Sequence, residues 1–379
     1  GSLHPDGSAT PSSDTAVANA GVATFSGLQL DGKSGTYTLA FNGTKPAGAG
    51  GGAFSTVESS SFTLNPGTVT KLHVQSYPNP LRNLAPFTVT VRGYDANDNW
   101  NTNWSAATVT LSQSDGLSGS LSGGTLATTV LADVATTSAS AGTATFSGLV
   151  FAALVASDYK FEVTSGGLTP DKTGAITLTP APATKLVIHT QPGSGAEPPT
   201  STLQFTPAPV VWAVDPQGNI DTTYTGTITA SIESHPLSGT ADLSGATAIA
   251  VAGVATFDGF VMTGKSGDYR LAYDGEAANG TDFDQKLSST FTLASLGARA
   301  LAVTQQPTTM VSGVTPGVSF RVAGVDDYGN TVDGFTGRVS VAIGRGTGGV
   351  LTGTTEVSAV AGVAEFDDLT IISSTQQDF

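Results

Sequence analysis

The chain has 379 residues, no cysteine and a formal net charge of −15, although only 12% of its residues are charged. Without cysteine it can form neither structural disulfides nor zinc–thiolate sites. Its acidic balance disfavours nucleic acid and anionic lipid as partners. No run of about 20 apolar residues is present, so we expect no membrane span in this segment.

One phrase, Gly-Val-Ala-Thr-Phe or a close variant of it, occurs four times. It begins at Gly21, Gly142, Gly253 and Gly362, at spacings of 121, 111 and 109 residues. Solenoid and propeller repeats have shorter periods, roughly 20–50 residues. The recurrence therefore predicts one domain per repeat.

Other landmarks recur in a constant order around this phrase. An opening strand comes first, at 71–74, 185–188 and 300–303. An acidic turn follows it, at 95–99, 215–219 and 326–330. After the phrase come a strand that begins with a tyrosine and then a closing strand, which starts near 61, 175 and 290.

The phase of these landmarks predicts four units. Units 70–182 and 183–297 are complete, whereas 1–69 and 298–379 are partial. One interpretation is a window cut from a longer array of domains. The alternative is that neighbouring molecules complete the partial units by strand addition. Both partial units contain the Gly-Val-Ala-Thr-Phe strand, an overlap that argues against a clean exchange.

Each unit is predicted to be a β-sandwich. Short segments such as 87–91, 107–111 and 227–232 alternate apolar and polar residues, and glycine, proline, asparagine and aspartate separate them. About seven strands in about 110 residues is typical of a sandwich, so we expect an all-β fold. The best core candidates are the phenylalanines of the repeated phrase, Phe25, Phe146, Phe257 and Phe366. The tyrosines Tyr37, Tyr159 and Tyr269 resemble a tyrosine corner, with the hydroxyl bound to nearby backbone.

The segments 183–192, 214–219 and 266–271 resemble the bacterial immunoglobulin-like repeats. Such repeats occur in large cell-surface, adhesin and surface-layer proteins, including the invasin and intimin group. The resemblance implies tandem immunoglobulin-like sandwiches in an elongated array at the cell surface or outside the cell. It also implies neighbouring repeats or copies of the chain as partners. One acidic turn departs from the pattern, because Asp98 stands where the other turns have Gly218 and Gly329.

The acidic turns are the strongest candidates for binding chemistry. Calcium takes six to eight oxygen ligands, and these turns offer clustered carboxylates and amides. The calcium candidates are Asp95, Asn97, Asp98, Asp215, Asp221, Asp326, Asp327 and Asp333. The alternative is a purely structural turn, in which each aspartate accepts hydrogen bonds from its own backbone. Apart from calcium, no cofactor is expected.

Two tryptophans beyond the first complete acidic turn are ligand candidates. Trp100 and Trp104 could form a flat platform for stacking a sugar ring, or they could cap that end of the sandwich. Trp212 aligns with Arg92 and Ala323, and a position that accepts such different side chains is expected to face solvent.

These patterns favour a structural extracellular protein over an enzyme. No serine–histidine–aspartate order repeats, the carboxylates lie mostly on turns, and no phosphate-binding loop is present. The first hypothesis is a stalk, filament or surface-layer element. The second is an adhesin or carbohydrate-binding module that recognises surface glycans or host and matrix proteins. The third is an accessory part of a secreted enzyme. Two of the linkers contain proline, and the proline-free linker at 294–298 is expected to be the most flexible.

Overall fold

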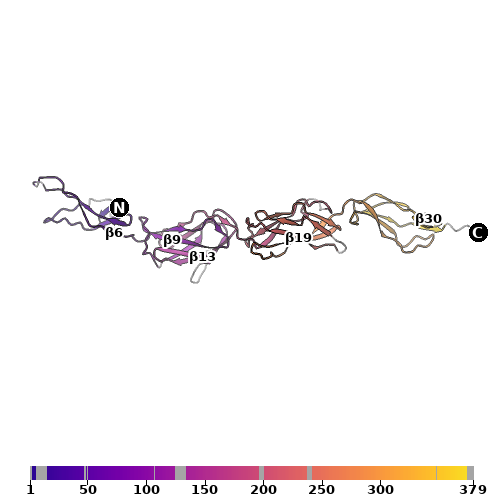
Figure 1. The fold of residues 1–379 in the computed structure, drawn as a ribbon, viewed down its shortest axis with the longest axis horizontal. Coiled ribbons are helices and arrows are strands. Elements are labelled where there is room, and N and C mark those ends of the chain that lie inside the picture. Colours follow the sequence, from indigo (N-terminus) through magenta and orange to yellow (C-terminus); the bar gives the residue numbers. More distant parts are fainter. Residues whose placement is uncertain are drawn as a thin grey trace, which may run out of the picture. The chain divides into compact units, whose positions relative to one another are not determined.

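The computed structural model describes residues 2–5, 15–46, 48, 50–105, 107–123, 134–195, 200–236, 241–346 and 348–373. Every regular element among them is a β-strand (Figure 1). The prediction of an all-β fold is confirmed. No helix in the described part of the chain is long and apolar enough to cross a membrane.

The chain forms two compact units, Gly1–Ala181 and Pro182–Phe379. The division lies one residue from the predicted boundary between 182 and 183. For the predicted units we use the names module 1 (1–69), module 2 (70–182), module 3 (183–297) and module 4 (298–379). Modules 1 and 2 lie in the first compact unit, and modules 3 and 4 lie in the second.

Module 1 is built from short two-stranded sheets. Its strands are β1 (Ser2–Pro5), β2 (Leu28–Asp31), β3 (Gly35–Tyr37), β4 (Ala40–Phe41), β5 (Val57–Glu58) and β6 (Phe62–Leu64). They pair as β1–β2, β3–β6 and β4–β5. In this module Phe25 is only half-buried and contacts the ring of Phe41 at 5.6 Å. The expectation that Phe25 is a core residue is wrong, because it is only half-buried and belongs to none of the core clusters of the described residues.

Module 2 is a sandwich of two four-stranded sheets. Its strands are β7 (Lys71–Ser76), β8 (Leu81–Arg82), β9 (Pro86–Tyr94), β10 (Thr108–Gln113), β11 (Gly119–Gly123), β12 (Val134–Ser138), β13 (Thr143–Ala153), β14 (Phe161–Thr164), β15 (Asp171–Lys172) and β16 (Leu178–Thr179). The sheet orders are β12-β10-β14-β15 and β11-β13-β9-β7. The short strands β8 and β16 pair with each other in parallel.

The core of module 2 follows from alternation along these strands. Along β9, Phe87, Val89 and Val91 are buried and the intervening residues are more exposed. They pack with inward residues of the facing sheet, such as Leu111 and Phe161, in one cluster. Burying side chains of this size stabilises the fold by roughly 1.5–3 kcal/mol each.

Module 3 has the same plan. Its strands are β17 (Lys185–Thr190), β18 (Val210–Val214), β19 (Thr227–Ser234), β20 (Ala241–Ser244), β21 (Thr247–Ile249), β22 (Val254–Thr256), β23 (Val261–Gly264), β24 (Gly267–Gly275), β25 (Lys286–Leu287) and β26 (Phe291–Leu293). The sheet β17-β18-β22 faces the sheet β21-β19-β24-β25, and β26 also pairs with β24. Side chains of both sheets form a second core cluster.

Module 4 contains β27 (Ala300–Gln305), β28 (Phe320–Val325), β29 (Arg338–Ser340), β30 (Gly349–Thr352), β31 (Glu356–Ser358), β32 (Val363–Phe366) and β33 (Thr370–Ser373). The sheet β27-β28-β32 repeats the order seen in module 3. Phe366 is buried in a third cluster, as Phe146 and Phe257 are in theirs. The prediction that these three phenylalanines are core residues is confirmed.

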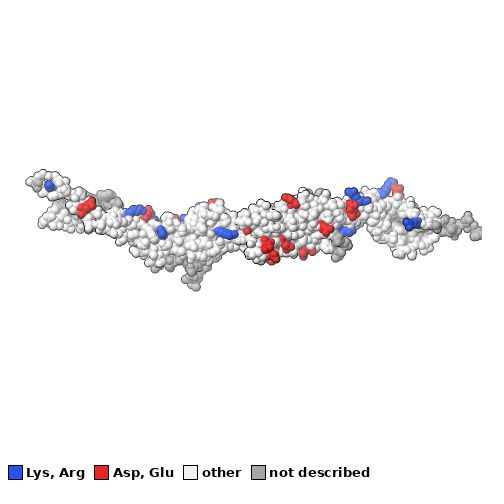
Figure 2. Space-filling view, in the orientation of Figure 1, with Lys and Arg blue, Asp and Glu red and all other residues white. Residues whose placement is uncertain are grey.

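Charge is distributed unevenly over the chain. Module 3 has eleven acidic and four basic side chains, which amounts to −7 of the total charge of −15. Figure 2 shows acidic side chains gathered on this module, whereas most of the remaining visible surface is uncharged.

The repeated phrase starts at a tight hairpin turn in all four modules. Its glycine and the alanine before it both have positive φ, for example 49° at Ala252 and 79° at Gly253. In module 3 the turn lies against the chain that follows the acidic turn. A Cβ added at Gly253 would come within 2.5 Å of the backbone oxygen of Asp221. The glycine is therefore required both by its φ and by this close approach.

We expect Gly253→Ala to destabilise module 3 more than Gly259→Ala. Gly259 has a similar φ of 76°, but a Cβ added there would meet no heavy atom within 4 Å. Its substitution should cost about 1–2 kcal/mol for the left-handed backbone alone. The clash at Gly253 should add roughly 1–3 kcal/mol. Calorimetric unfolding of the full chain measures the destabilisation caused by each variant. Equal destabilisation would show that the hairpin does not need the close approach between Gly253 and Asp221.

Candidate functional site: the module junctions

Each acidic turn is closed by the carboxylate of its first aspartate. In module 4, Oδ1 of Asp326 accepts hydrogen bonds from the amides of Tyr328 and Asn330, both at 2.9 Å. Its Oδ2 accepts from Nδ2 of Asn330 at 2.9 Å and from the amide of Leu296 in the preceding linker at 3.0 Å. The Asp326 residue is 3% exposed, and the four hydrogen bonds replace water as the solvation of its carboxylate.

The other two turns repeat this arrangement. Asp95 accepts from the amides of Asn97 and Asn99, from Nδ2 of Asn99 and from the amide of Gly67. Asp215 accepts from the amides of Gln217 and Asn219 and from Nδ2 of Asn219. The structure thus has the geometry of an Asx-type turn in all three places.

These hydrogen bonds determine the ionisation of the buried carboxylates. Burial by itself raises the pKa of Asp326 and of Asp95. The hydrogen bonds from Asn330 and Leu296, or from Asn99 and Gly67, outweigh burial and hold each pKa below its ordinary value. Both groups are anions at neutral pH because their donors stabilise the charged form.

This geometry argues against the calcium hypothesis. A cation would have to displace the backbone and asparagine donors that already occupy Asp95, Asp215 and Asp326. In the described part of the chain, no three histidine, cysteine, aspartate or glutamate side chains are close enough to hold a metal ion together. The arrangement fits the structural turn that the sequence offered as the alternative.

The remaining calcium candidates have other contacts. Asp221 accepts hydrogen bonds from the amide of Ala183 at 2.8 Å and from Thr223. Asn97 donates its side-chain amide to Asp31. Asp98 pairs with Lys71, and Asp327 lies 3.9 Å from Nε of Arg299. Asp333 is exposed beside the loop that follows the last acidic turn.

The acidic turn of module 4 also docks onto a turn of module 3. The amide of Ser266 donates to Oδ1 of Asn330 at 2.8 Å, and Nδ2 of Asn330 donates to the oxygen of Gly264 at 3.2 Å. Nζ of Lys265 donates to the oxygen of Gly329 at 2.9 Å. One buried asparagine therefore closes its own turn and binds the neighbouring module.

The same contacts join module 2 to module 1. The amide of Ser34 donates to Oδ1 of Asn99 at 2.8 Å, and Nδ2 of Asn99 donates to the oxygen of Gly32 at 2.8 Å. Nζ of Lys33 donates to the oxygen of Asp98 at 3.1 Å. We call the Gly-Lys-Ser-Gly turns, residues 32–35 and 264–267, the receptor turns.

A tyrosine supports each receptor turn from within its own module. The hydroxyl of Tyr269 donates to the oxygen of Lys265 at 2.7 Å, and that of Tyr37 donates to the oxygen of Lys33. In module 2 the hydroxyl of Tyr159 donates to the oxygen of Leu154 at 2.7 Å. The expected anchoring of the tyrosines on nearby backbone is confirmed, and in two modules the anchored carbonyl belongs to the receptor turn.

Asp98 stands where the other acidic turns have glycine, but the backbone conformation of the turn is the same. Asp98 has a φ of 60°, which matches the left-handed conformation of Gly218 and Gly329. A non-glycine residue in this conformation costs roughly 1–2 kcal/mol. Its ion pair with Lys71, which also lowers the pKa of Asp98, offsets part of that cost.

The proline-free linker belongs to a junction with the same contacts as the first. Leu296 of this linker donates its amide to Asp326, as Gly67 of the first linker does to Asp95. Its composition predicted the most flexible joint. The hydrogen bonds tie the linker to the acidic turn without any proline.

The tryptophan candidates lie at the end of module 2. The indole of Trp100 donates to the oxygen of Gly142 at 3.0 Å, and the guanidinium of Arg92 lies over its ring at 3.9 Å. Trp104 packs on the core and covers Gly93, where an added Cβ would come within 2.7 Å of the indole. These contacts fit the capping alternative better than an open sugar platform.

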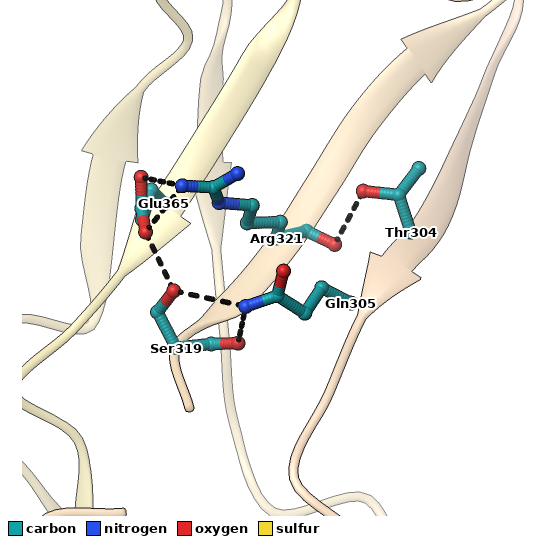
Figure 3. Close-up of polar contacts among 5 residues, drawn as sticks. All are labelled: Thr304, Gln305, Ser319, Arg321 and Glu365. Atoms are coloured by element: carbon teal, nitrogen blue, oxygen red, sulfur yellow. Dashed lines mark hydrogen bonds and ion pairs between the residues drawn. The ribbon is translucent and has the colours of Figure 1, made fainter. Parts of the chain in front are cut away.

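The outer face of the small sheet differs from module to module. In module 3, Trp212 is half-buried and stacks on His189 with a centroid distance of 3.9 Å. In module 4, Arg321 of β28 pairs with Glu365 of β32 (Figure 3). Hydrogen bonds from Ser319 and Arg321 lower the pKa of Glu365. The expectation that the position of Arg92, Trp212 and Ala323 faces solvent is wrong for Ala323, which is 0% exposed, and Arg92 and Trp212 are only half-exposed.

The residues that make the junction were only partly visible in the sequence. The aspartates were recognised as site candidates, but the asparagines four residues later and the receptor turns were not. The available signal was the identical Gly-Lys-Ser-Gly at 32–35 and 264–267, each followed by a tyrosine two residues later. Nothing local indicates that this turn meets an asparagine 64 or 65 residues further along the chain.

Comparisons with known proteins give distant structural similarities. No family model matches the chain, and no curated protein matches it. The chain is similar to the Escherichia coli adhesin FdeC, at 17% identity and a TM-score of 0.36, over 82% of this chain and 91% of that one. It is also similar to invasin, a bacterial integrin-binding protein, at 11% identity and a TM-score of 0.29, over 81% of this chain and 55% of that one. Domains 5–6 of the surface-layer protein SbsC match at 16% identity and a TM-score of 0.20, over 60% of this chain and 98% of that one. All three are too distant to assign a function.

We expect Tyr269→Phe to destabilise module 3 and Tyr273→Phe not to. Both side chains are fully buried on β24, and burial raises the pKa of both. The hydroxyl of Tyr269 supports the receptor turn, whereas that of Tyr273 has no hydrogen-bond partner among the described residues. Loss of the Tyr269 hydroxyl should lower the free energy of unfolding by about 1 kcal/mol. Loss of the Tyr273 hydroxyl should leave it unchanged or raise it. Urea unfolding of the two variants decides this, and equal losses would contradict the assigned role of Tyr269.

We expect Asp326→Asn to change how stability depends on pH. The folded-state pKa of Asp326 lies below its ordinary value of 3.8. Its stabilisation is therefore fully present above that value and is lost as the pH falls through the folded-state pKa. The variant should be less stable by at least about 2 kcal/mol at neutral pH, because an amide cannot accept all four hydrogen bonds. The free energies of unfolding should converge in acid, and a difference that is constant from about pH 6 to about pH 2 would refute the argument.

Proposed function

We propose that this chain is a structural segment of a bacterial surface protein, in which successive modules are held at defined junctions to form a stalk, filament or surface-layer element. The observation that carries the proposal is the repetition of one junction. Asn99 and Asn330 make equivalent contacts with two receptor turns of the same sequence. A junction that is made twice from the same residue types is a feature of a repeating scaffold.

The contacts at each junction favour a fixed joint over a loose tether. The asparagine and the aspartate that it bonds are both buried, at 4% and 3% exposure in module 4. A buried polar group that loses its partner costs roughly 1–3 kcal/mol, so opening the joint is unfavourable. The partners of each module are therefore its neighbours in the chain or further copies of them.

The second hypothesis, an adhesin or carbohydrate-binding module, receives less support from these residues. Arg92 lies over the ring of Trp100, which is 36% exposed, and Trp104 packs against the backbone at Gly93. A sugar ring would have to displace those contacts before it could stack. The proposal assigns neither catalysis nor an obligatory cofactor to the chain, and it places the protein outside the cell.

The fixed joint is tested with spin labels, which the absence of cysteine makes specific. Thr256 of module 3 and Ser340 of module 4 are both exposed and can each be replaced by cysteine for labelling. We expect a narrow distance distribution in the full chain and a broad one after Asn330→Ala. Asn279→Ala, which removes an exposed asparagine from a loop of module 3, is the control and should leave the distribution narrow. A broad distribution in the unmodified chain would contradict the proposal.

The surface location is tested on cells. An antibody raised against this chain should label intact cells of the source organism, and brief external protease treatment should remove the label. Labelling that appears only after the cells are permeabilised would refute an extracellular role. Chelation of divalent cations with EDTA should leave the spin-label distances unchanged if the acidic turns act without calcium.

A further inference from the structure

The closing segment of module 2 pairs in parallel with a segment near the start of the module. Strand β16 lies beside β8, with Leu178 opposite Leu81 and Thr179 opposite Arg82. Closer to the beginning, Lys71 of β7 forms a parallel bridge with Thr169. The two segments that lead into and out of the module are therefore bonded directly to each other.

Several hydrogen bonds join these segments. The amides of Leu81 and Asn83 donate to the oxygens of Thr177 and Thr179, at 2.9 and 2.8 Å. Asn79 donates to the oxygen of Ala175 and accepts from the amide of Thr177, both at 3.0 Å. The hydroxyl of Thr179 donates to the oxygen of Leu81 at 3.3 Å. At the bridge, the amide of Leu72 donates to Thr169 and that of Thr169 donates to Thr70.

The polarity of this pairing determines how a pulling force acts on it. Tension in a tandem chain enters module 2 at the amino-terminal side of β7 and β8 and leaves at the carboxyl-terminal side of β16. Two parallel segments pulled from opposite chain ends slide along each other, so all the bonds between them are loaded together. An antiparallel pair pulled in this way would be opened from one end, one bond at a time.

Part of the pairing is protected from water. Leu81, Asn83, Ile176 and Leu178 are each 1–2% exposed, whereas the two hydrogen bonds of Asn79 lie at the exposed end. Water cannot easily compete for the hydrogen bonds made by the buried amides of Leu81 and Asn83, so these bonds must break before they can be replaced. Asn83 is held further by two hydrogen bonds with the backbone of Ala153, each at 3.1 Å.

We propose that this parallel pairing is a mechanical clamp that makes module 2 the strongest element of the chain under tension. The clamp adds a mechanical property to the proposed structural function. It rests on that function in one respect, because a load must reach module 2 through its two ends. Among its described residues, module 3 has a weaker counterpart, a parallel bridge between Thr200 and Ala294 in which the amide of Ser201 lies 3.5 Å from the oxygen of Ala294.

The test is single-molecule force spectroscopy on the full chain, pulled from its two termini. Asn79→Ala removes two hydrogen bonds of the clamp, and Thr179→Val removes one with little change of shape. In either variant the strongest unfolding event should shift to lower force, with an unfolding rate that rises about fivefold per lost bond of ordinary strength.

Asp115→Ala is the matched control. Asp115 accepts three hydrogen bonds in module 2, from Gln113, Leu117 and Lys160, but lies outside the segments that carry the load. It should lower the thermal stability of the module and leave the strongest event unchanged. The clamp is refuted if Asp115→Ala lowers that force as much as Asn79→Ala does, or if neither clamp variant changes it. Because the measurement needs no cell surface, failure of the clamp and failure of the surface role are distinguishable.

Discussion

The burial of one ionised aspartate in each acidic turn is the constraint on which the junctions depend. A carboxylate removed from water must receive hydrogen bonds from nearly every direction, or burial would neutralise it. In modules 2 and 4 these donors come from the turn itself, from the asparagine four residues later and from the linker before the module. Satisfying the charge therefore orients the asparagine and ties down the linker. The oriented asparagine then binds the receptor turn of the preceding module.

Much of the fold could be predicted from the sequence because its causes are local. Alternation along 87–91 places Phe87, Val89 and Val91 on one face, and the structure buries all three. The same reasoning identified Phe146, Phe257 and Phe366. It failed for Phe25, which has the same place in the phrase but lies in a module of two-stranded sheets and is only half-buried. Periodicity indicates which face points inward, but it does not show whether a second sheet covers that face.

The site was less predictable because its contacts are not local. An aspartate followed by glycine and asparagine predicts a turn, and the turn is present. That Asn330 also meets Ser266, 64 residues earlier, follows from how two modules adjoin, which no single motif encodes. Trp100 shows the same limitation, because its indole donates to Gly142, 42 residues away, and its ring lies under Arg92. Aromatic residues near a loop suggest a ligand until their partners within the fold are known.

The receptor turn and the acidic turn have a further consequence for how such a chain changes length. Each junction uses a short turn from one module and a short turn from the next, and several of its contacts involve backbone atoms. Module 3 carries both kinds of turn, the acidic turn 215–219 and the receptor turn 264–267, so a duplicated copy of it would bring both. Recombination that copies such a module could thus lengthen the protein while the new joint kept the same contacts.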